Sequence, residues 1–182
     1  MQIRNYKKVY ITKKGEKRIN DGHPWIYDGE IIKKDDEIIN GDIVDVTNEK
    51  NKYLGSGFYN NNSKIVVRLI SRNANDTFDN DFFRRRIRYA IDYRLAVMEN
   101  NTNAFRVIFG EADELPGLTV DKFNDILVVQ ILSLGIELRK DIILKILYEE
   151  MEKKNFNISG IYIRNDVDIR IKEGLEEYKG WY

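Results

Sequence analysis

The chain has 182 residues, which suits one medium domain or two small ones. Hydrophobic residues make up 42% of it, enough to build a core and to exclude a disordered chain. It has no apolar run near the roughly 20 residues that span a bilayer, and its first residues lack the apolar stretch of a signal peptide. We therefore expect a soluble cytoplasmic protein that makes no membrane contact.

Cysteine is absent and histidine occurs once, which excludes disulfides, thiol nucleophiles and metal clusters built on Cys or His. The net charge is zero, but the first 20 residues carry seven basic side chains and a single acid, Glu16. Such a local excess indicates either a confined contact with an anionic partner or a solvated face.

The first 72 residues alternate short β-branched or aromatic runs with turn residues, a pattern typical of a small barrel. We expect strands at 9–11, 25–32, 43–46, 53–59 and 65–70. Between the first two strands, residues 13–21 predict a short helix that Gly22 and Pro24 bring to an end. Gly55 and Gly57 predict a bulge or bend, because the third glycine and following helix of a cofactor-binding turn are missing.

Residues 72–76 form a polar linker, where we place a boundary between domains 1–72 and 73–182. After it the sequence predicts a helix, a strand, a hairpin, a second helix and a further strand, at 80–100, 105–109, 118–132, 137–152 and 158–164. The hairpin turns at Asn124-Asp125, and residues 176–182 look like an element cut short. The second domain is therefore expected to be α+β.

The N-terminal helix and the segment after it carry the first candidate site. Lys13, Lys14, Lys17 and Arg18 lie within six positions and can face one groove, which we interpret as a phosphate-binding patch. For His23 two interpretations stay open, contact with a base or a role in ending the helix. Two also exist for Trp25, of which we favour burial in the barrel core over stacking on a base.

The helix at 80–100 is rich in arginine on the faces that do not carry its apolar stripe: Arg84, Arg85, Arg86, Arg88 and Arg94. This face either lines a groove for RNA or is solvated, with local pairs such as Arg88 with Asp92. The loop at 111–121 contains four acids without the spacing of a calcium loop, and we expect them to hydrogen-bond turn backbone or to pair with arginines such as Arg106. In the same loop, Pro116-Gly117 predicts a type II turn.

Taken in order, several segments resemble the PUA-domain class I SAM-dependent methyltransferases that modify 23S rRNA, the 5-methylcytosine type above all. They are KKGEKRINDGHPWIY at 13–27, GDIVDV at 41–46, LGSGFYNNNSKIVVRLISR at 54–72, FFRRRIRYAIDYR at 82–94, FRVIFGEADELPGLTVD at 105–121 and RNDVDIRIKEGL at 164–175. The resemblance implies an α+β chain: a PUA-like β-barrel over 1–72, then a central domain of the EEHEE type over 73–182. It also implies a Rossmann-like methyltransferase domain beyond Tyr182, absent from this chain, which would hold the SAM motif and the catalytic cysteine.

The resemblance further implies that the chain grips ribosomal RNA and performs no chemistry itself. The RNA-binding residues would be Lys13, Lys14, Lys17, Arg18 and His23, with Arg68 and Arg72 at the rim and Arg84, Arg85 and Arg88 as a second tier. We expect no catalytic, cofactor-binding or metal-binding residue here, and S-adenosylmethionine only in the full-length protein. Expected partners are ribosomal RNA, the protein's own methyltransferase domain and a second copy paired through an exposed strand edge.

Two alternatives to the enzyme fragment are a stand-alone PUA-containing RNA-binding adaptor without catalytic activity and a structural protein that makes no RNA contact. Continuation of the reading frame past Tyr182 into a glycine-rich strand–turn–helix would favour the enzyme over the adaptor. RNA binding in vitro would separate both from the structural protein.

Overall fold

A computed structural model describes residues 4–98 and 102–182. The chain divides into two compact units, the first ending at Asp76 and the second beginning at Thr77. The sequence predicts this division at residue 72. Each unit has its own sheet.

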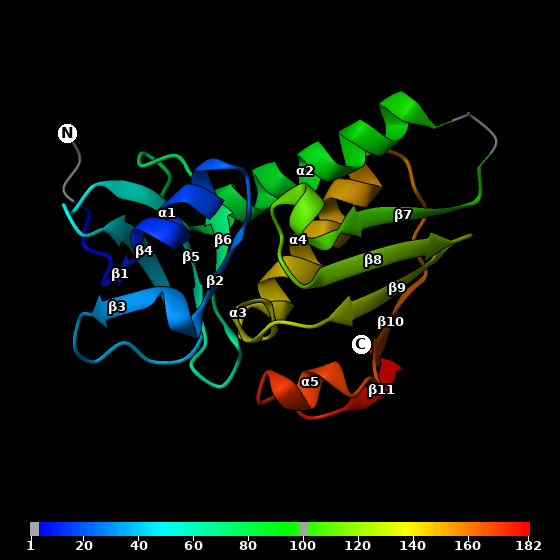
Figure 1. The fold of residues 1–182 in the computed structure, drawn as a ribbon. Helices are drawn as coiled ribbons and strands as arrows, with labels where there is room; N and C mark the ends of the chain where they lie inside the picture. The colour runs from blue at the N-terminus through cyan, green and yellow to red at the C-terminus, as the bar shows by residue number, and fades with distance from the viewer. Residues whose placement is uncertain (1–3, 99–101) are drawn as a thin grey trace. The chain divides into compact units, whose positions relative to one another are not determined.

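The first unit is a six-stranded sheet in the order β2-β6-β5-β4-β1-β3 (Figure 1). Its strands are β1 (Lys8–Ile11), β2 (Trp25–Tyr27), β3 (Ile31–Lys34), β4 (Ile43–Asn48), β5 (Tyr53–Tyr59) and β6 (Ile65–Ser71). Register shifts interrupt the pairing of β1 with β3, β2 with β6, β4 with β5 and β5 with β6. Such bulges bend a sheet, and this one curls into a partial barrel, which confirms the predicted architecture.

The prediction of a single strand at 25–32 is wrong. The structure divides it into β2, a 3-10 turn η1 (Asp28–Glu30) and β3, and these two strands form opposite edges of the sheet. The break occurs because Glu30 is buried and its Oε2 accepts a hydrogen bond from the backbone N of Tyr27, 3.0 Å away. Pattern alone cannot separate two strands joined by so short a turn.

The helix α1 (Lys13–Asn20) begins and ends as predicted. Thr12 caps it, its Oγ1 accepting from the backbone N of Gly15 at 3.2 Å. At the other end Gly22 has φ +99°, and the backbone N atoms of Gly22 and His23 donate to the carbonyls of Ile19 and Arg18, a Schellman motif. Ile19 joins the core formed by the inward-facing residues of the sheet, which include Val9, Val44, Val67 and Leu69.

The second unit contains a mixed five-stranded sheet in the order β11-β10-β9-β8-β7. Its strands are β7 (Ala104–Phe109), β8 (Leu118–Phe123), β9 (Ile126–Ile131), β10 (Gly160–Asn165) and β11 (Tyr178–Trp181). β9 and β10 are parallel, and all other neighbours in this sheet are antiparallel. The hairpin predicted at Asn124-Asp125 is confirmed, with Asn124 at φ 52° and Phe123 opposite Ile126.

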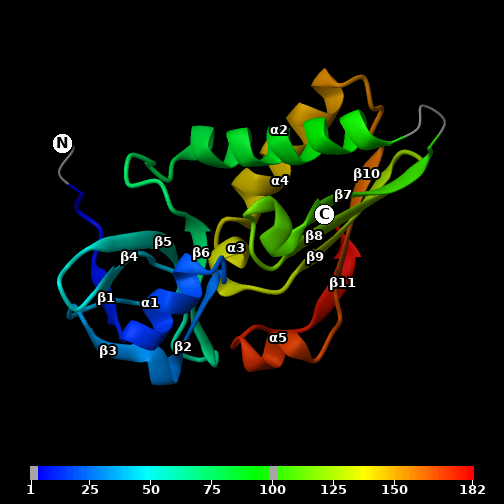
Figure 2. The same cartoon turned by 45° about the horizontal axis from the view of Figure 1, so that its top comes forward.

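The helices of the second unit are α2 (Asn80–Val97), α3 (Leu134–Glu137), α4 (Lys140–Lys153) and α5 (Ile169–Lys172), with a 3-10 turn η2 (Gly110–Asp113). Figure 2 shows α2 and α4 packed side by side over one face of the sheet. The helix predicted at 80–100 corresponds to α2, and residues 99 and 100 lie outside the described part of the chain. The helix predicted at 137–152 is interrupted before Lys140 and forms α3 and α4.

The segment at 176–182 contains β11, which pairs with β10. Arg170 holds this segment in place: its side chain is 1% exposed, and Nε donates to the carbonyl of Glu176 at 2.7 Å. The same guanidinium contacts Glu137 at 3.0 Å and the carbonyl of Ile131. Tyr178 of β11 also donates to Glu137, at 2.9 Å, so one buried network joins α3, α5 and two strands.

Candidate nucleic-acid interface

Three lysines of α1 face solvent. The helix buries Gly15 and Ile19, and this leaves Lys13, Lys14 and Lys17 exposed on its outer side. Within the described residues, none of their ammonium groups has a hydrogen bond or ion pair with a protein group. These side chains are therefore cations without a protein counter-ion, and their charges are available to the phosphates of a nucleic acid.

Arg18 of the same helix differs because it is bound to the protein. Its NH1 lies 2.7 Å from Oε1 of the buried Glu30, and its guanidinium lies 4.8 Å from the centre of the Tyr27 ring. The hydrogen bond with Glu30 raises the pKa of Arg18 above its usual value. Arg18 thus fixes α1 against η1 and offers less charge to a ligand than the lysines do.

Three aromatic rings follow the helix. The rings of His23, Trp25 and Tyr27 meet edge to face, with centroids 5.6 Å apart for His23 and Trp25 and 6.5 Å apart for Trp25 and Tyr27. The expectation that Trp25 fills the barrel core is wrong, because Trp25 is half-buried and Ile26 takes the core position. Alternation along β2 puts residues 25 and 27 on the same face, opposite Ile26.

His23 is held by its neighbours in a neutral state. Its Nε2 lies 2.7 Å from NH2 of Arg18 and its Nδ1 lies 3.2 Å from the backbone N of Trp25. Both neighbours can only donate, which disfavours the imidazolium with its N–H at each ring nitrogen. Burial lowers the pKa of His23, and the positive charge of Arg18 lowers it further. Arg72, which is exposed, donates to the backbone carbonyl of His23 at 3.3 Å. His23 therefore serves as a hydrogen-bonding and packing group, and its ring supplies no positive charge near neutral pH.

Arg68 completes the cluster. It pairs with Trp25 across β2 and β6, and its guanidinium lies 5.6 Å from the centre of the Trp25 ring. The structure therefore brings Arg18, His23, Arg68 and Arg72 together around the half-buried Trp25, beside the exposed lysines of α1. The contact of Arg68 with Trp25 cannot be predicted from sequence spacing, because it depends on the register between β2 and β6.

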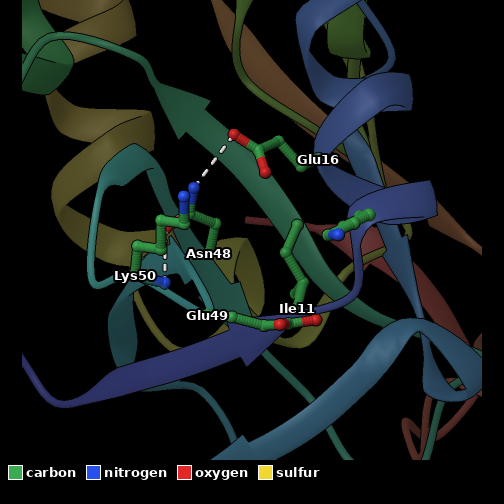
Figure 3. Close-up of a pocket in the computed structure, with 6 residues that line it drawn as sticks. Ile11, Glu16, Asn48, Glu49 and Lys50 are labelled. Atoms are coloured by element: carbon green, nitrogen blue, oxygen red, sulfur yellow. Dashed lines mark hydrogen bonds between the residues drawn. The ribbon is translucent and has the colours of Figure 1, made fainter.

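A pocket of about 270 Å³ lies at the beginning of α1, between that helix and the β4–β5 turn (Figure 3). Glu16 accepts a hydrogen bond from Nδ2 of Asn48 at 3.0 Å, and Oδ1 of Asn48 accepts from the backbone N of Lys50 at 3.0 Å. Lys13 and Glu49 also line the pocket. Two acids oppose two lysines, so the pocket has no charge preference for an anion. Its position is not predictable from the sequence, because a distant turn forms one wall.

The arginine face of α2 is largely bound to acids that the sequence does not place near it. Arg84 donates to Glu149 and Glu150 of α4, both at 2.8 Å, and the hydrogen bond with Glu150 contributes most to raising its pKa. Arg85 is half-buried against the Phe82 ring, and Arg88 is exposed. The predicted pair of Arg88 with Asp92 is wrong, because Asp92 instead pairs with Lys154 at 2.5 Å.

Three of the four acids in the 111–121 loop pair with arginines, and Asp113 also accepts from the backbone N of Phe109 at 2.6 Å, so both predicted kinds of contact occur. Asp121 binds Arg106 at 2.8 Å, Asp113 binds Arg94 at 2.5 Å, and Glu114 binds Arg86. The predicted turn is also confirmed: Gly117 has φ +79°, and the backbone N of Leu118 donates to the carbonyl of Leu115 at 3.0 Å. Among the described residues, no group of three or more acids, histidines or cysteines is arranged to hold a metal.

Gly55 and Gly57 do not form a cofactor-binding turn. Both lie inside β5, where the register with β6 shifts between Ser56 and Gly57, so the predicted bulge is confirmed. A Cβ atom on Gly57 would lie 2.2 Å from the carbonyl oxygen of Arg68, so the glycine permits close approach of two strands and not of a ligand. No helix in the described ranges is long and apolar enough to cross a membrane.

Comparison with known proteins identifies the class of the first unit. Residues 9–72, which include β2 to β6 and all of β1 except Lys8, match the model of the PUA-like domain family. The first unit is therefore a PUA-like domain, in agreement with the curled sheet and the short helix that precedes β2.

The whole chain is similar to proteins named ribosomal RNA large subunit methyltransferase I. It is 36% identical over 94% of its length to the protein of Alteromonas mediterranea, 37% identical over 94% to that of Aeromonas hydrophila and 33% identical over 96% to that of Klebsiella pneumoniae. It spans 42% to 43% of the length of these relatives. The chain is thus similar to the N-terminal part of these methyltransferases, their PUA-like domain and central domain.

Solved structures show the same fold. A putative SAM-dependent methyltransferase from Streptococcus mutans superimposes with a TM-score of 0.73, covering 86% of this chain and 40% of that one, at 18% identity. A putative methyltransferase solved in complex with SAH superimposes equally well. The α+β class and the order of the two units are thus found in known structures.

Proposed function

We propose that this chain is the RNA-binding part of a SAM-dependent methyltransferase of large-subunit ribosomal RNA, acting on cytosine C5 in the cytoplasm. The observation that carries the proposal is the exposed, unpartnered charge of Lys13, Lys14 and Lys17 on a PUA-like domain. Together with Arg72, these residues define the basic surface of α1. The identity with rRNA methyltransferases supports ribosomal RNA as the ligand.

Within this interface the side chains take different roles. The lysines and Arg72 would contact phosphates, which position an RNA without reading its sequence. Trp25, Tyr27 and His23 present ring edges between the guanidinium groups of Arg18 and Arg68, and could contact bases or riboses at the margin. Arg18 acts as a positioning residue, because its contact with Glu30 fixes the helix that carries the lysines.

S-adenosylmethionine supplies the methyl group in enzymes of this class. The residues of this chain do not fit it, since the paired glycines lie inside a strand. We propose that a further domain of the full-length protein binds this cofactor. Calorimetric titration of the 182-residue chain with SAM should then give no heat of binding, and micromolar affinity would contradict this assignment.

Salt-dependent binding of a large-subunit rRNA fragment tests the RNA interface. Replacing Lys13, Lys14 and Lys17 with Ala should weaken binding and flatten the log–log salt slope by roughly 0.7 for each single-strand phosphate that the variant no longer binds. The matched control replaces Lys64, Lys145 and Lys172, three other exposed lysines, and should leave both quantities unchanged. The interface would instead belong to α2 if the first triple variant bound normally while replacement of Arg84, Arg85 and Arg88 abolished binding.

A further inference from the structure

A groove of about 380 Å³ lies along α2 where this helix meets η2, wholly within the second unit. Its lining includes Tyr89 and Tyr93 from α2, together with the ion pairs that join α2 to the η2 region. We call it the tyrosine groove. It uses none of the residues of the basic surface of α1.

The two tyrosine rings are presented to solvent. Tyr89 is 53% exposed and Tyr93 is 60% exposed, and they lie one helical turn apart. In the described ranges neither hydroxyl has a hydrogen-bond partner. The core-facing side of α2 is supplied by other residues, among them Ile87 and Ile91, so these rings do not support the fold. Two adjacent exposed aromatic rings form a surface on which a planar group can stack.

Each ring also has a guanidinium beside it. The Arg94 guanidinium lies 5.3 Å from the centre of the Tyr93 ring, and that of Arg88 lies 5.8 Å from the centre of the Tyr89 ring. Arg88 is exposed, and within the described chain no acid pairs with it. It is therefore a cation available to a phosphate next to a stacked base.

The walls of the groove carry balanced, fixed charge. Arg94 binds Asp113 through two contacts of 2.5 and 2.7 Å, and Arg86 binds Glu114. Because these charges cancel, the groove itself does not attract a polyanion. The contacts of Arg94 and Asp113 with each other and with backbone hold the walls in place, and the half-exposed carboxylate of Glu114 offers an acceptor to the edge of a nucleobase.

We propose that the tyrosine groove binds an unstacked base of single-stranded RNA, with Tyr89 and Tyr93 stacking on it and Arg88 contacting its phosphate. Exposed rings beside a carboxylate acceptor suit a planar, neutral, polar group, whereas a duplex would present only its phosphates and a shallow groove. The inference rests on the proposed function in taking RNA as the ligand, and it assigns a second contact in a different unit.

The test uses the 182-residue chain and a short single-stranded oligoribonucleotide that carries the fluorescent base 2-aminopurine. Binding should quench the fluorophore. Replacing Tyr89 and Tyr93 with Ala should remove the quenching and weaken binding about five- to 150-fold, as expected when one base no longer stacks, with the salt slope unchanged. Phe at both positions should preserve quenching, and Tyr148→Ala, an exposed tyrosine of α4, is the matched control. Arg88→Ala should flatten the salt slope by roughly 0.7.

The outcomes separate this inference from the proposed function. Loss of structured-RNA binding in the triple lysine variant, with quenching intact, would support both contacts as independent. Unchanged quenching and affinity in the Tyr89→Ala, Tyr93→Ala variant would overturn the inference and leave the basic surface of α1 unaffected. If that variant bound RNA normally but differed from the parent in oligomeric state by sedimentation, the groove would be a contact between copies of the chain. That result would also overturn the inference.

Discussion

Arg18 extends from α1 to the buried carboxylate of Glu30, with NH1 and Oε1 2.7 Å apart. The other oxygen of this carboxylate accepts from the backbone N of Tyr27. One acid thus ties the helix that carries the candidate RNA contacts to the turn that joins the two edges of the sheet. The position of the basic surface of α1 therefore depends on a side chain that does not itself need to touch RNA.

Arg18→Ala should lower the midpoint of thermal unfolding, because it leaves a buried carboxylate without its counter-ion. Lys17→Ala, at the adjacent exposed position, should leave the midpoint unchanged. Adding Glu30→Gln to Arg18→Ala should recover part of the loss, since the amide oxygen can still accept from Tyr27 without a buried charge. Calorimetry of the four proteins checks the pair, and equal midpoints for Arg18→Ala and the parent would contradict its structural role.

His23 should make stability depend on pH. Burial and the charge of Arg18 lower its pKa in the folded state below the ordinary value of 6.5. Below that value the unfolded chain binds more protons than the folded chain, so the free energy of unfolding should fall as pH falls through about 6.5 toward the folded pKa. Urea denaturation at about pH 7.5 and about pH 5.5 should show this loss, and His23→Gln should lessen it. A parent protein more stable at the lower pH would refute the assignment.

Arg170 should be the most sensitive charged residue of the second unit. Its guanidinium is buried and contacts Glu137, the carbonyl of Glu176 and the carbonyl of Ile131. Arg170→Ala should destabilise the chain by about 3–5 kcal/mol, the usual effect of removing one partner of a buried ion pair. Arg164→Ala, which removes the exposed pair with Asp166, should change the unfolding midpoint little. Urea denaturation would measure both variants.

Gly57→Ala should destabilise the first unit. The added Cβ would lie 2.2 Å from the Arg68 carbonyl oxygen, so β5 and β6 would have to separate at the bulge. The expected loss is about 1–3 kcal/mol, as for other overpacked sites. Gly29→Ala is the control, because nothing lies within 4 Å of a Cβ there. Similar unfolding curves for the two variants would show that the strands can shift at little cost.

Features with a local signal are predictable from the sequence. Gly22 ends α1, Gly117 lies in the type II turn before β8, and Asn124 lies in the β8–β9 hairpin, because positive φ selects particular residues at particular positions. Features that depend on a distant partner are not predictable in this way. The buried carboxylate of Glu30 divides a predicted strand, and Glu149 and Glu150 bind an arginine predicted to face RNA.

The residues of the candidate site are predictable only in part. Spacing places the lysines on α1, but the contacts of Arg68 with Trp25 and of Arg72 with His23 depend on how β6 returns to β2. The exposure of Tyr89 and Tyr93 agrees with helical periodicity, because both positions lie off the stripe that contains Ile87 and Ile91. The groove beside them could not be predicted, because the η2 region forms its other wall.

The parallel pairing of β9 with β10 has a consequence for how the second unit assembles. β8 and β9 are joined by two residues and can pair early, whereas β10 can join them only after α3 and α4 have carried the chain back across the sheet. Closing so long a connection costs entropy before any contact is gained, which slows that step. During synthesis the backbone groups on one edge of β9 would therefore stay unpaired until α4 packs on the sheet and β10 pairs with β9. β11 would then pair with β10.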